Sequence, residues 1–244
     1  MVLRISDLTS PDIIDYHLIK VDRQTKPSPE IQKLVDEGRR SLRKQMSQDL
    51  NKVIAKSEQN YPSRLGRTPL LGNFLADAIR ESTGSEIALD SGELYGDGLK
   101  KGPITIADVY GLAPHTYSWA DGGWHIFTCD AYALSIQWAL AWLSSSTHSS
   151  LVVSGMELSI DGFRLPREVR VNGEPMDYFK VYKTAFSEGF IEALAGRPQL
   201  AKLLCKNMTD TGILIREALV QKATQLKVFN DKNLGEPRVH FWTE

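Results

Sequence analysis

Histidines, the side chains best suited to metal-assisted or acid–base chemistry near neutral pH, are spread along this sequence rather than clustered. None of the five lies two or four residues from another: they are His17, His115, His125, His148 and His240. Hydrolysis by a metal-activated water needs several histidine, aspartate or cysteine ligands around each ion. The sequence therefore predicts no di-metal phosphoesterase centre of its own, and we assign no catalytic and no metal-binding residue.

Other chemical motifs are equally scarce. No Gly-x-x-x-x-Gly-Lys-Ser/Thr phosphate loop and no Gly-x-Ser-x-Gly nucleophile motif occurs. The only two cysteines, Cys129 and Cys205, exclude a disulfide framework and a cysteine-rich metal site but leave one bridge possible. Both fall in predicted helices at positions that suit small buried hydrophobic side chains, so we expect two free thiols.

The composition is that of an ordinary globular protein. The chain has 244 residues, 42% of them hydrophobic, and a formal net charge of -1. It is long enough for one domain with an appendage. Because there is no general basic surface, we expect no nucleic-acid partner. No apolar stretch is long enough to cross a bilayer, so we expect no membrane span.

Periodicity divides the chain into a short leading part and one domain. Residues 1–50 are expected to form a linker strand, over 16–22, and a helix that Ser28 caps and Pro29 begins. Residues 51–244 are expected to form the domain, with a helical tail. The tail helices are predicted over 185–194, 198–205 and 211–224. Meandering strands mixed with separate helices predict the α+β class.

An apolar helix is predicted from Asp130 onward. Its Leu134, Trp138 and Trp142 recur every four residues. An aromatic stripe with helical spacing packs in a core far more often than it binds a cofactor, so we expect these side chains to be buried.

The most informative stretch is a helix over residues 69–82 that leads, through a turn at Gly84, into a buried strand over 86–89. The helix contains the run Leu71-Gly72-Asn73-Phe74-Leu75-Ala76-Asp77-Ala78. This pair of elements resembles the start of the C-terminal, substrate-binding domain of the 5'-nucleotidase family. Further landmarks follow in the family's order across about residues 53–195: Gly102-Pro103-Ile104-Thr105, Val153-Ser154-Gly155 and Asn172-Gly173-Glu174-Pro175.

The resemblance implies a layered α/β/β/α arrangement and a role in substrate recognition. In this family the catalytic centre belongs to an N-terminal metallophosphatase domain that binds two divalent metal ions. The chain would then be part of a phosphoric ester hydrolase in nucleotide catabolism, inactive alone, with that domain as its partner. Its ligand would be a nucleotide or another small phosphoester. The family is usually exported, so the resemblance also implies the periplasm or cell surface.

The family's substrate motifs are altered in this sequence. Tyr95 stands where the family has a substrate-contacting arginine, and Pro114-His115-Thr116-Tyr117 replaces a Pro-Phe-Gly-Asn motif whose phenylalanine stacks on the base. Phe186 matches the second stacking aromatic. With Asn73 of the opening helix, the substrate-binding candidates are Phe186, His115, Tyr95, Tyr117 and Asn73. His115 and Phe186 either sandwich a flat ring or are a surface histidine and a core phenylalanine.

Two functions remain open on this basis. The first is a substrate-recognition domain with a diverged nucleotide pocket. The second is a non-catalytic binding or interaction module that kept the fold and lost nucleotide binding. Asn-His-Glu and His-x-His motifs in the reading frame upstream would favour the first.

Overall fold

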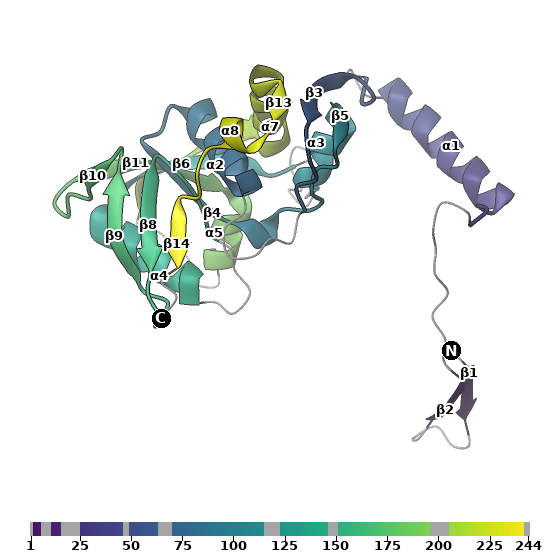
Figure 1. The fold of residues 1–244 in the computed structure, drawn as a ribbon, viewed down its shortest axis with the longest axis horizontal. Coiled ribbons are helices and arrows are strands. Elements are labelled where there is room, and N and C mark those ends of the chain that lie inside the picture. Colours follow the sequence, from purple (N-terminus) through teal and green to yellow (C-terminus); the bar gives the residue numbers. More distant parts are fainter. Residues whose placement is uncertain are drawn as a thin grey trace. The chain divides into compact units, whose positions relative to one another are not determined.

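The structure is a computed structural model that describes residues 2–5, 11–15, 25–45, 49–62, 70–114, 123–145, 151–195 and 205–241 (Figure 1). The chain divides into two compact units, residues 1–49 and 50–244, and each is described by itself. Within the described residues, no helix has the length and apolar character needed to cross a membrane.

The first unit contains a hairpin and a helix. Strands β1 (Val2–Ile5) and β2 (Pro11–Asp15) pair antiparallel, and α1 spans Pro29–Gln45. The helix begins where the capping pattern predicts, and the backbone N–H of Gln32 donates to the carbonyl of Ser28 at 2.8 Å. The strand predicted over 16–22 lies outside the described residues.

A five-stranded sheet forms the centre of the second unit, in the order β12-β6-β11-β4-β7. Its strands are β4 (Ile87–Ser91), β6 (His125–Tyr132), β7 (Leu151–Ser154), β11 (Val181–Ser187) and β12 (Cys205–Leu214). Only β4 and β11 run parallel; the other neighbours are antiparallel. The carboxyl ends of β4 and β11 therefore meet at one edge of the sheet.

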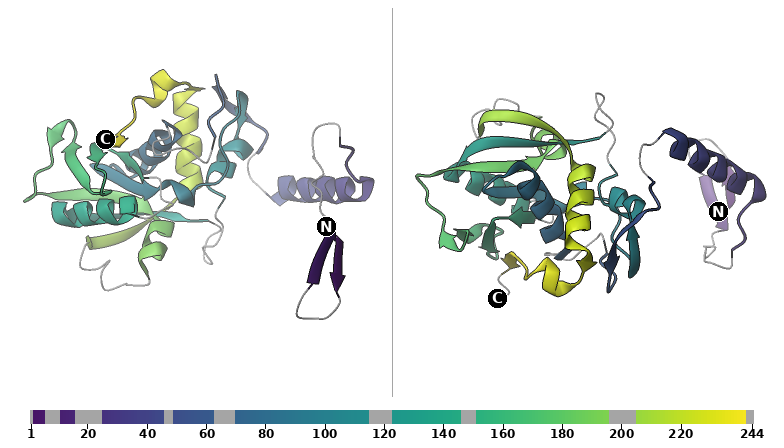
Figure 2. Two further views of the ribbon diagram at one scale, coloured as in Figure 1. Left: turned by 60° about the horizontal axis from the view of Figure 1, so that its bottom comes forward. Right: turned by 90° about the horizontal axis from the view of Figure 1, so that it is seen from above.

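Helices cover both faces of this sheet (Figures 1 and 2). On one face, α2 (Leu70–Thr83) and α7 (Ile215–Leu226) form a core around Phe74 and Leu219. On the other, α4 (Ala133–Ser145) and α5 (Glu188–Ala195) form a second core around Leu140 and Phe186.

Two smaller sheets complete the unit. One has the order β10-β9-β8-β14, and the other β13-β3-β5. The remaining bounds are β3 (Val53–Ser57), η1 (Gly92–Leu94), β5 (Gly102–Thr105), α3 (Ile106–Leu112), β8 (Met156–Ile160), β9 (Pro166–Val171), β10 (Glu174–Pro175), β13 (Val228–Phe229), α8 (Asp231–Leu234) and β14 (Val239–Phe241). The predicted α+β class is confirmed.

A carboxylate on α2 joins three distant parts of the chain. Asp77 accepts hydrogen bonds from Arg238 Nη1 and Nη2, at 2.7 and 2.9 Å, and a further one from the hydroxyl of Ser154. Arg80, one turn along the helix, donates to the same Ser154 hydroxyl at 2.7 Å. This network attaches α2 to the end of β7 and to the segment that leads into β14.

Three predicted helix boundaries are wrong near strand ends. The helix predicted from Asp130 begins at Ala133, because β6 stays paired through Tyr132. The helix predicted from residue 185 begins at Glu188, and the one predicted from residue 211 begins at Ile215, because β11 and β12 continue further. In both cases, pairing with β6 extends the strand past the residue at which the helix was predicted to begin. Most of the helix predicted over 198–205 lies outside the described residues.

The expected burial of the aromatic stripe on α4 is also wrong. Leu134 is 66% exposed, and Trp138 and Trp142 are each 37% exposed. Ile136 and Leu140, on the opposite side of the helix, are buried in the core. Because α4 is apolar all round, its sequence does not indicate which side meets the protein.

The expectation of two free thiols is also wrong. Cys129 lies in β6 and Cys205 begins the neighbouring strand β12, and the two form a disulfide with a Cα–Cα distance of 5.6 Å. The prediction of free thiols fails because both residues lie in paired strands rather than in the expected helices. His125 and Asp210 also connect β6 to β12, with the imidazole Nδ1 3.0 Å from a carboxylate oxygen.

Thiol titration tests the bridge. In denaturant without reductant we expect no titratable thiol per chain, and two after reduction. A disulfide that closes a loop of 76 residues should stabilise the fold by about 4 kcal/mol through chain entropy. Urea unfolding of the double variant Cys129→Ala/Cys205→Ala should show a loss of that order. Two thiols titrating before reduction would contradict the bridge.

Candidate functional site

Polar residues gather at the edge of the central sheet where β4 and β11 end. Ala185 pairs with Ala88 in the parallel ladder, so Ser187 and Asp90, two residues further along, reach the same edge. Ligands of sheets with parallel strands commonly bind outside the carboxyl ends of those strands. The sequence places small polar residues at both ends: Asp90 and Ser91 are the last two residues of β4, and Ser187 is the last residue of β11.

Asp90 is fully buried at this edge. One carboxylate oxygen accepts from the backbone N–H of Ser91 at 2.8 Å. The other accepts from the Tyr95 hydroxyl and from the backbone N–H of Ser187, each at 3.1 Å. Burial raises the pKa of Asp90 to about 6, although these hydrogen bonds favour the ionised form. Burial, followed by the Asp90 charge, raises the pKa of Tyr95 well above its usual value.

Ser187 also caps helix α5, which begins at the next residue. Its hydroxyl accepts from the backbone N–H of Phe190 at 3.1 Å, which satisfies one of the free donors of the first turn. This cap fixes the two phenylalanines on either side of it. Phe186 and Phe190 lie with ring centroids 5.6 Å apart, and Phe190 meets the edge of Trp142 at 6.3 Å.

An apolar hollow opens beside these rings. Its empty volume is about 460 Å³, part of which is open to solvent. Among the described residues, its wall carries no charged side chain, and Ser135 and Thr184 supply the only hydroxyl groups. The apolar part of the wall consists of Leu89, Ala131, Ile136, Ala139, Phe186, Phe190, Ile191, Cys205 and Met208. Such a hollow can hold an aromatic or aliphatic group, and among the described residues its wall offers no cation for a phosphate.

Two of the predicted substrate-binding residues lie near the ends of β4 and β11 but on opposite faces of the central sheet, Tyr95 against the core of α2 and α7 and Phe186 in the core of α4 and α5. Phe186 forms part of the hollow and is 3% exposed. Tyr95 lies at the neighbouring edge, where its hydroxyl donates to Asp90. Asn73 lies elsewhere, on α2, and its Nδ2 donates to the carbonyls of Leu234 and Glu236, at 2.9 Å each.

The other two predicted residues, His115 and Tyr117, lie outside the described part of the chain. Sequence reasoning missed Asp90, Ser187 and Phe190. The available signal was a polar residue at the end of an apolar run, at Asp90 and again at Ser187. Over the described ranges, no group of three or more histidine, cysteine, aspartate or glutamate side chains is placed to hold a metal ion.

The raised pKa of Asp90 predicts a pH dependence of stability. In the unfolded chain Asp90 loses its proton near pH 3.8, and in the folded chain near pH 6. The folded state therefore holds this proton more tightly, and the contribution of Asp90 to the free energy of unfolding should fall as the pH rises from about 4 to about 6. The difference corresponds to about 3 kcal/mol. Urea unfolding at half-unit steps of pH measures it.

Two variants serve as controls for this titration. Asp90→Asn should remove the fall between pH 4 and pH 6. Tyr95→Phe should keep it, because the carboxyl group remains and loses only a donor that favours its ionised form. A stability difference between the wild type and Asp90→Asn that stays constant from pH 4 to pH 6 would contradict the assignment to Asp90.

Comparison with known proteins gives no match by sequence and several by structure. No family profile matches this chain, and no curated protein matches it. The 5'-nucleotidase precursor of Thermus thermophilus superposes with a TM-score of 0.71 at 24% identity, over 87% of this chain and 43% of that one.

Two further structures agree. Sulfate thiohydrolase SoxB of Thermus thermophilus gives a TM-score of 0.66 at 17% identity, over 89% of this chain and 40% of that one. The NAD nucleotidase of Haemophilus influenzae gives 0.64 at 13% identity, over 88% and 41%. This chain thus spans about two fifths of the length of each structure. The described part of the chain has the α+β fold of the C-terminal domain of 5'-nucleotidases, as its motifs predicted.

Proposed function

We propose that this chain supplies the substrate-recognition domain of a two-domain metallophosphoesterase of the 5'-nucleotidase class, and that its nucleotide pocket has diverged. The observation that carries this proposal is the hydrogen bond from Tyr95 to Asp90. Tyr95 occupies the position of the family's substrate-contacting arginine, and its hydroxyl is directed into the protein. A ligand anion at this edge would meet a buried carboxylate and no guanidinium group from this position.

Catalysis would come from the N-terminal metallophosphatase domain of such an enzyme. That domain would bring the two divalent metal ions and the water nucleophile. The similar structures differ in the reactions their names give: a 5'-nucleotidase, an NAD nucleotidase and a sulfate thiohydrolase. A fold shared by such different hydrolases supports a recognition domain whose ligand changes while the architecture stays.

The ligand we propose is a small phosphoester whose organic part is apolar. The hollow beside Phe186 and Phe190 offers an uncharged wall that suits an aromatic or aliphatic group. A nucleoside would have to hydrogen-bond through its base and ribose, and the two hydroxyl groups of Ser135 and Thr184 are few partners for that purpose. The phosphate would extend toward the partner domain.

The proposed location is the periplasm or the cell surface. The disulfide between Cys129 and Cys205 supports it, because structural disulfides persist mainly in oxidising compartments. The exported character of the family that the motifs resemble points the same way.

A non-catalytic binding or interaction module is the second candidate function. The exposed aromatic side chains of α4 favour it, because a surface of this kind is typical of a contact with another macromolecule. The reading frame upstream of Met1 separates the two functions: Asn-His-Glu and His-x-His motifs there support the phosphoesterase.

The chain alone should release no phosphate. We expect no metal-dependent hydrolysis of adenosine or uridine monophosphate, with Mg²⁺, Mn²⁺ or Zn²⁺, above the rate in buffer. The physical reason is the lack, among the described residues, of a ligand cluster for even one metal ion. Release of inorganic phosphate measures the outcome. Turnover at about 1 s⁻¹ or faster, a rate typical of enzymes, would contradict the proposal.

Nucleosides and nucleotides should bind this chain with dissociation constants above about 1 mM. Loss of a charge-assisted hydrogen bond costs about 1.5–3 kcal/mol, and loss of a stacking partner about 1–3 kcal/mol. Every 1.4 kcal/mol is a factor of ten in affinity. Calorimetric titration with adenosine, uridine and their monophosphates measures the constants. Phenyl phosphate should bind at least about tenfold more tightly than methyl phosphate, because a phenyl ring buries much more apolar surface in the hollow than a methyl group does.

A pair of core variants tests where binding occurs. Phe186→Ala alters the hollow, whereas Phe74→Ala removes a buried ring from the opposite face of the sheet. The preference for phenyl phosphate should be lost in the first variant and kept in the second, with circular dichroism as the check on folding. Micromolar nucleotide binding that only Phe186→Ala abolishes would show that the nucleotide pocket survives.

A further inference from the structure

Seven exposed apolar side chains lie on α4 and on two turns that contact it, and we call this surface the α4 face. Three lie on the helix, two in the turn between β8 and β9, and two in the turn before β11. They are Leu134, Trp138, Trp142, Phe163, Leu165, Tyr178 and Phe179. In the left view of Figure 2, α4 (teal) lies on the outside of the second unit with no other helix or strand in front of it.

Hydrogen bonds hold both turns against the helix. Gln137 Nε2 donates to the Tyr178 hydroxyl at 2.8 Å, and the Ser144 hydroxyl donates to the carbonyl of Arg164 at 2.6 Å. The first contact lies near the middle of α4 and the second at its C-terminal end. The two turns that carry four of the seven side chains therefore lie beside α4, one near its middle and one at its C-terminal end.

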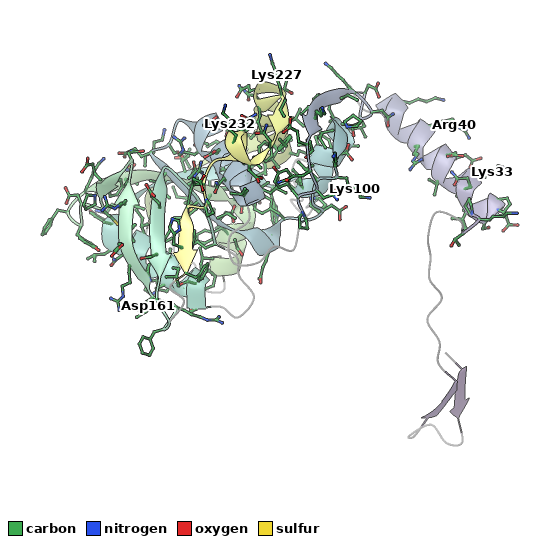
Figure 3. The ribbon with its side chains drawn as sticks, in the orientation of Figure 1. Lys33, Arg40, Lys100, Asp161, Lys227 and Lys232 are labelled. Carbon is green, nitrogen blue, oxygen red and sulfur yellow. A yellow bond between two sulfur atoms is a disulfide. The ribbon has the colours of Figure 1, made fainter. Side chains whose placement is uncertain are left out.

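The most exposed rings are held outward by aspartates. Asp161, labelled in Figure 3, accepts from the backbone N–H groups of Phe163 and Leu165, at 2.9 and 2.8 Å. Asp177 accepts from the backbone N–H of Phe179 at 2.9 Å. Phe163 is 86% and Phe179 97% exposed. Two ordered turns that each project a phenylalanine into water indicate a surface that another molecule covers.

The charge pattern favours a protein over a bilayer. Helix α4 has no lysine, arginine, aspartate or glutamate in its 13 residues. Helices that lie on membranes carry basic residues along their polar side to meet anionic lipid. Enrichment in tryptophan, tyrosine and phenylalanine with few charges is typical of the core of a protein–protein interface.

We propose that two copies of this chain associate through the α4 face in a symmetric dimer. An uncharged helix can pair with its own copy without repulsion between like charges. The five aromatic side chains leave roughly 500–750 Å² of their surface exposed, at about 150–250 Å² for each whole side chain. The two leucines add to this area. A stable interface needs about 800 Å² per partner, which the face approaches before any polar rim is counted.

Two-fold symmetry sets the pairing of the helices. Trp138 lies midway between Leu134 and Trp142, four residues from each. When two copies of α4 cross antiparallel about an axis at Trp138, Leu134 of each copy meets Trp142 of the other. Each residue of the stripe then has an apolar partner, as an isologous contact requires.

Analytical ultracentrifugation of the full chain tests the proposal. The wild type should sediment with twice the 27.3 kDa mass of one chain at micromolar concentrations. Leu134→Glu places a charge against Trp142 of the other copy and should weaken the dimer at least tenfold. Phe179→Glu changes a side chain with almost no contacts in its own copy, so the monomer should fold normally while the dimer weakens.

Leu34→Glu is the matched control. Leu34 is 62% exposed on helix α1, against 66% for Leu134 on α4, and the chemical change is the same. This variant should remain dimeric. A wild type that is monomeric up to about 100 μM would overturn the proposal. So would a dimer that Leu34→Glu dissociates and Leu134→Glu does not, or binding to anionic lipid vesicles that Leu134→Glu abolishes. None of these readouts depends on ligand binding.

Discussion

The packing of the second unit depends on the hydrogen bonds that the carboxylate of Asp77 accepts. This carboxylate holds α2 on the sheet through Ser154 at the end of β7, and it holds the C-terminal segment through both Nη atoms of Arg238. Burial raises the pKa of Asp77, but the hydrogen bonds from Arg238 and Ser154 outweigh it and keep the pKa below its usual value. A partly buried carboxylate is tolerable only with such partners. With α2 in place, one face of the five-stranded sheet is closed.

Local signals were enough to predict the elements that lie nearest this network. The helix predicted over 69–82 is Leu70–Thr83, and the strand predicted over 86–89 is Ile87–Ser91. Apolar periodicity and turn residues act over a few positions, so a sequence shows them directly. The start of α5 and the length of β12 depend on pairing with β6, which is distant in the sequence. The disulfide was not predictable for the same reason, because it joins residues 76 apart that only the pairing of β12 with β6 brings together.

The candidate site was predictable in part. Sequence motifs indicated Phe186 and Tyr95, and both lie near the ends of β4 and β11. The direction of the Tyr95 hydroxyl was not predictable, because it depends on a carboxylate that several strands bury together. Asn73 shows a similar dependence: both of its amide hydrogens are used on carbonyls about 160 residues away. The polar ends of both Tyr95 and Asn73 are thus used in hydrogen bonds within the protein.

The connection between β12 and β6 has a consequence for solubility. β12 is a border strand of the central sheet, and its ladder with β6 is interrupted between Lys206 and Thr209 and again between Asp210 and Leu214. Irregular border strands are poor templates for the addition of a foreign strand, and natural proteins use such irregularity against aggregation. An interrupted ladder is also easier to detach. The Cys129–Cys205 bridge joins β12 covalently to β6. The irregular strand can therefore resist pairing with strands of other molecules and still stay attached to its own sheet.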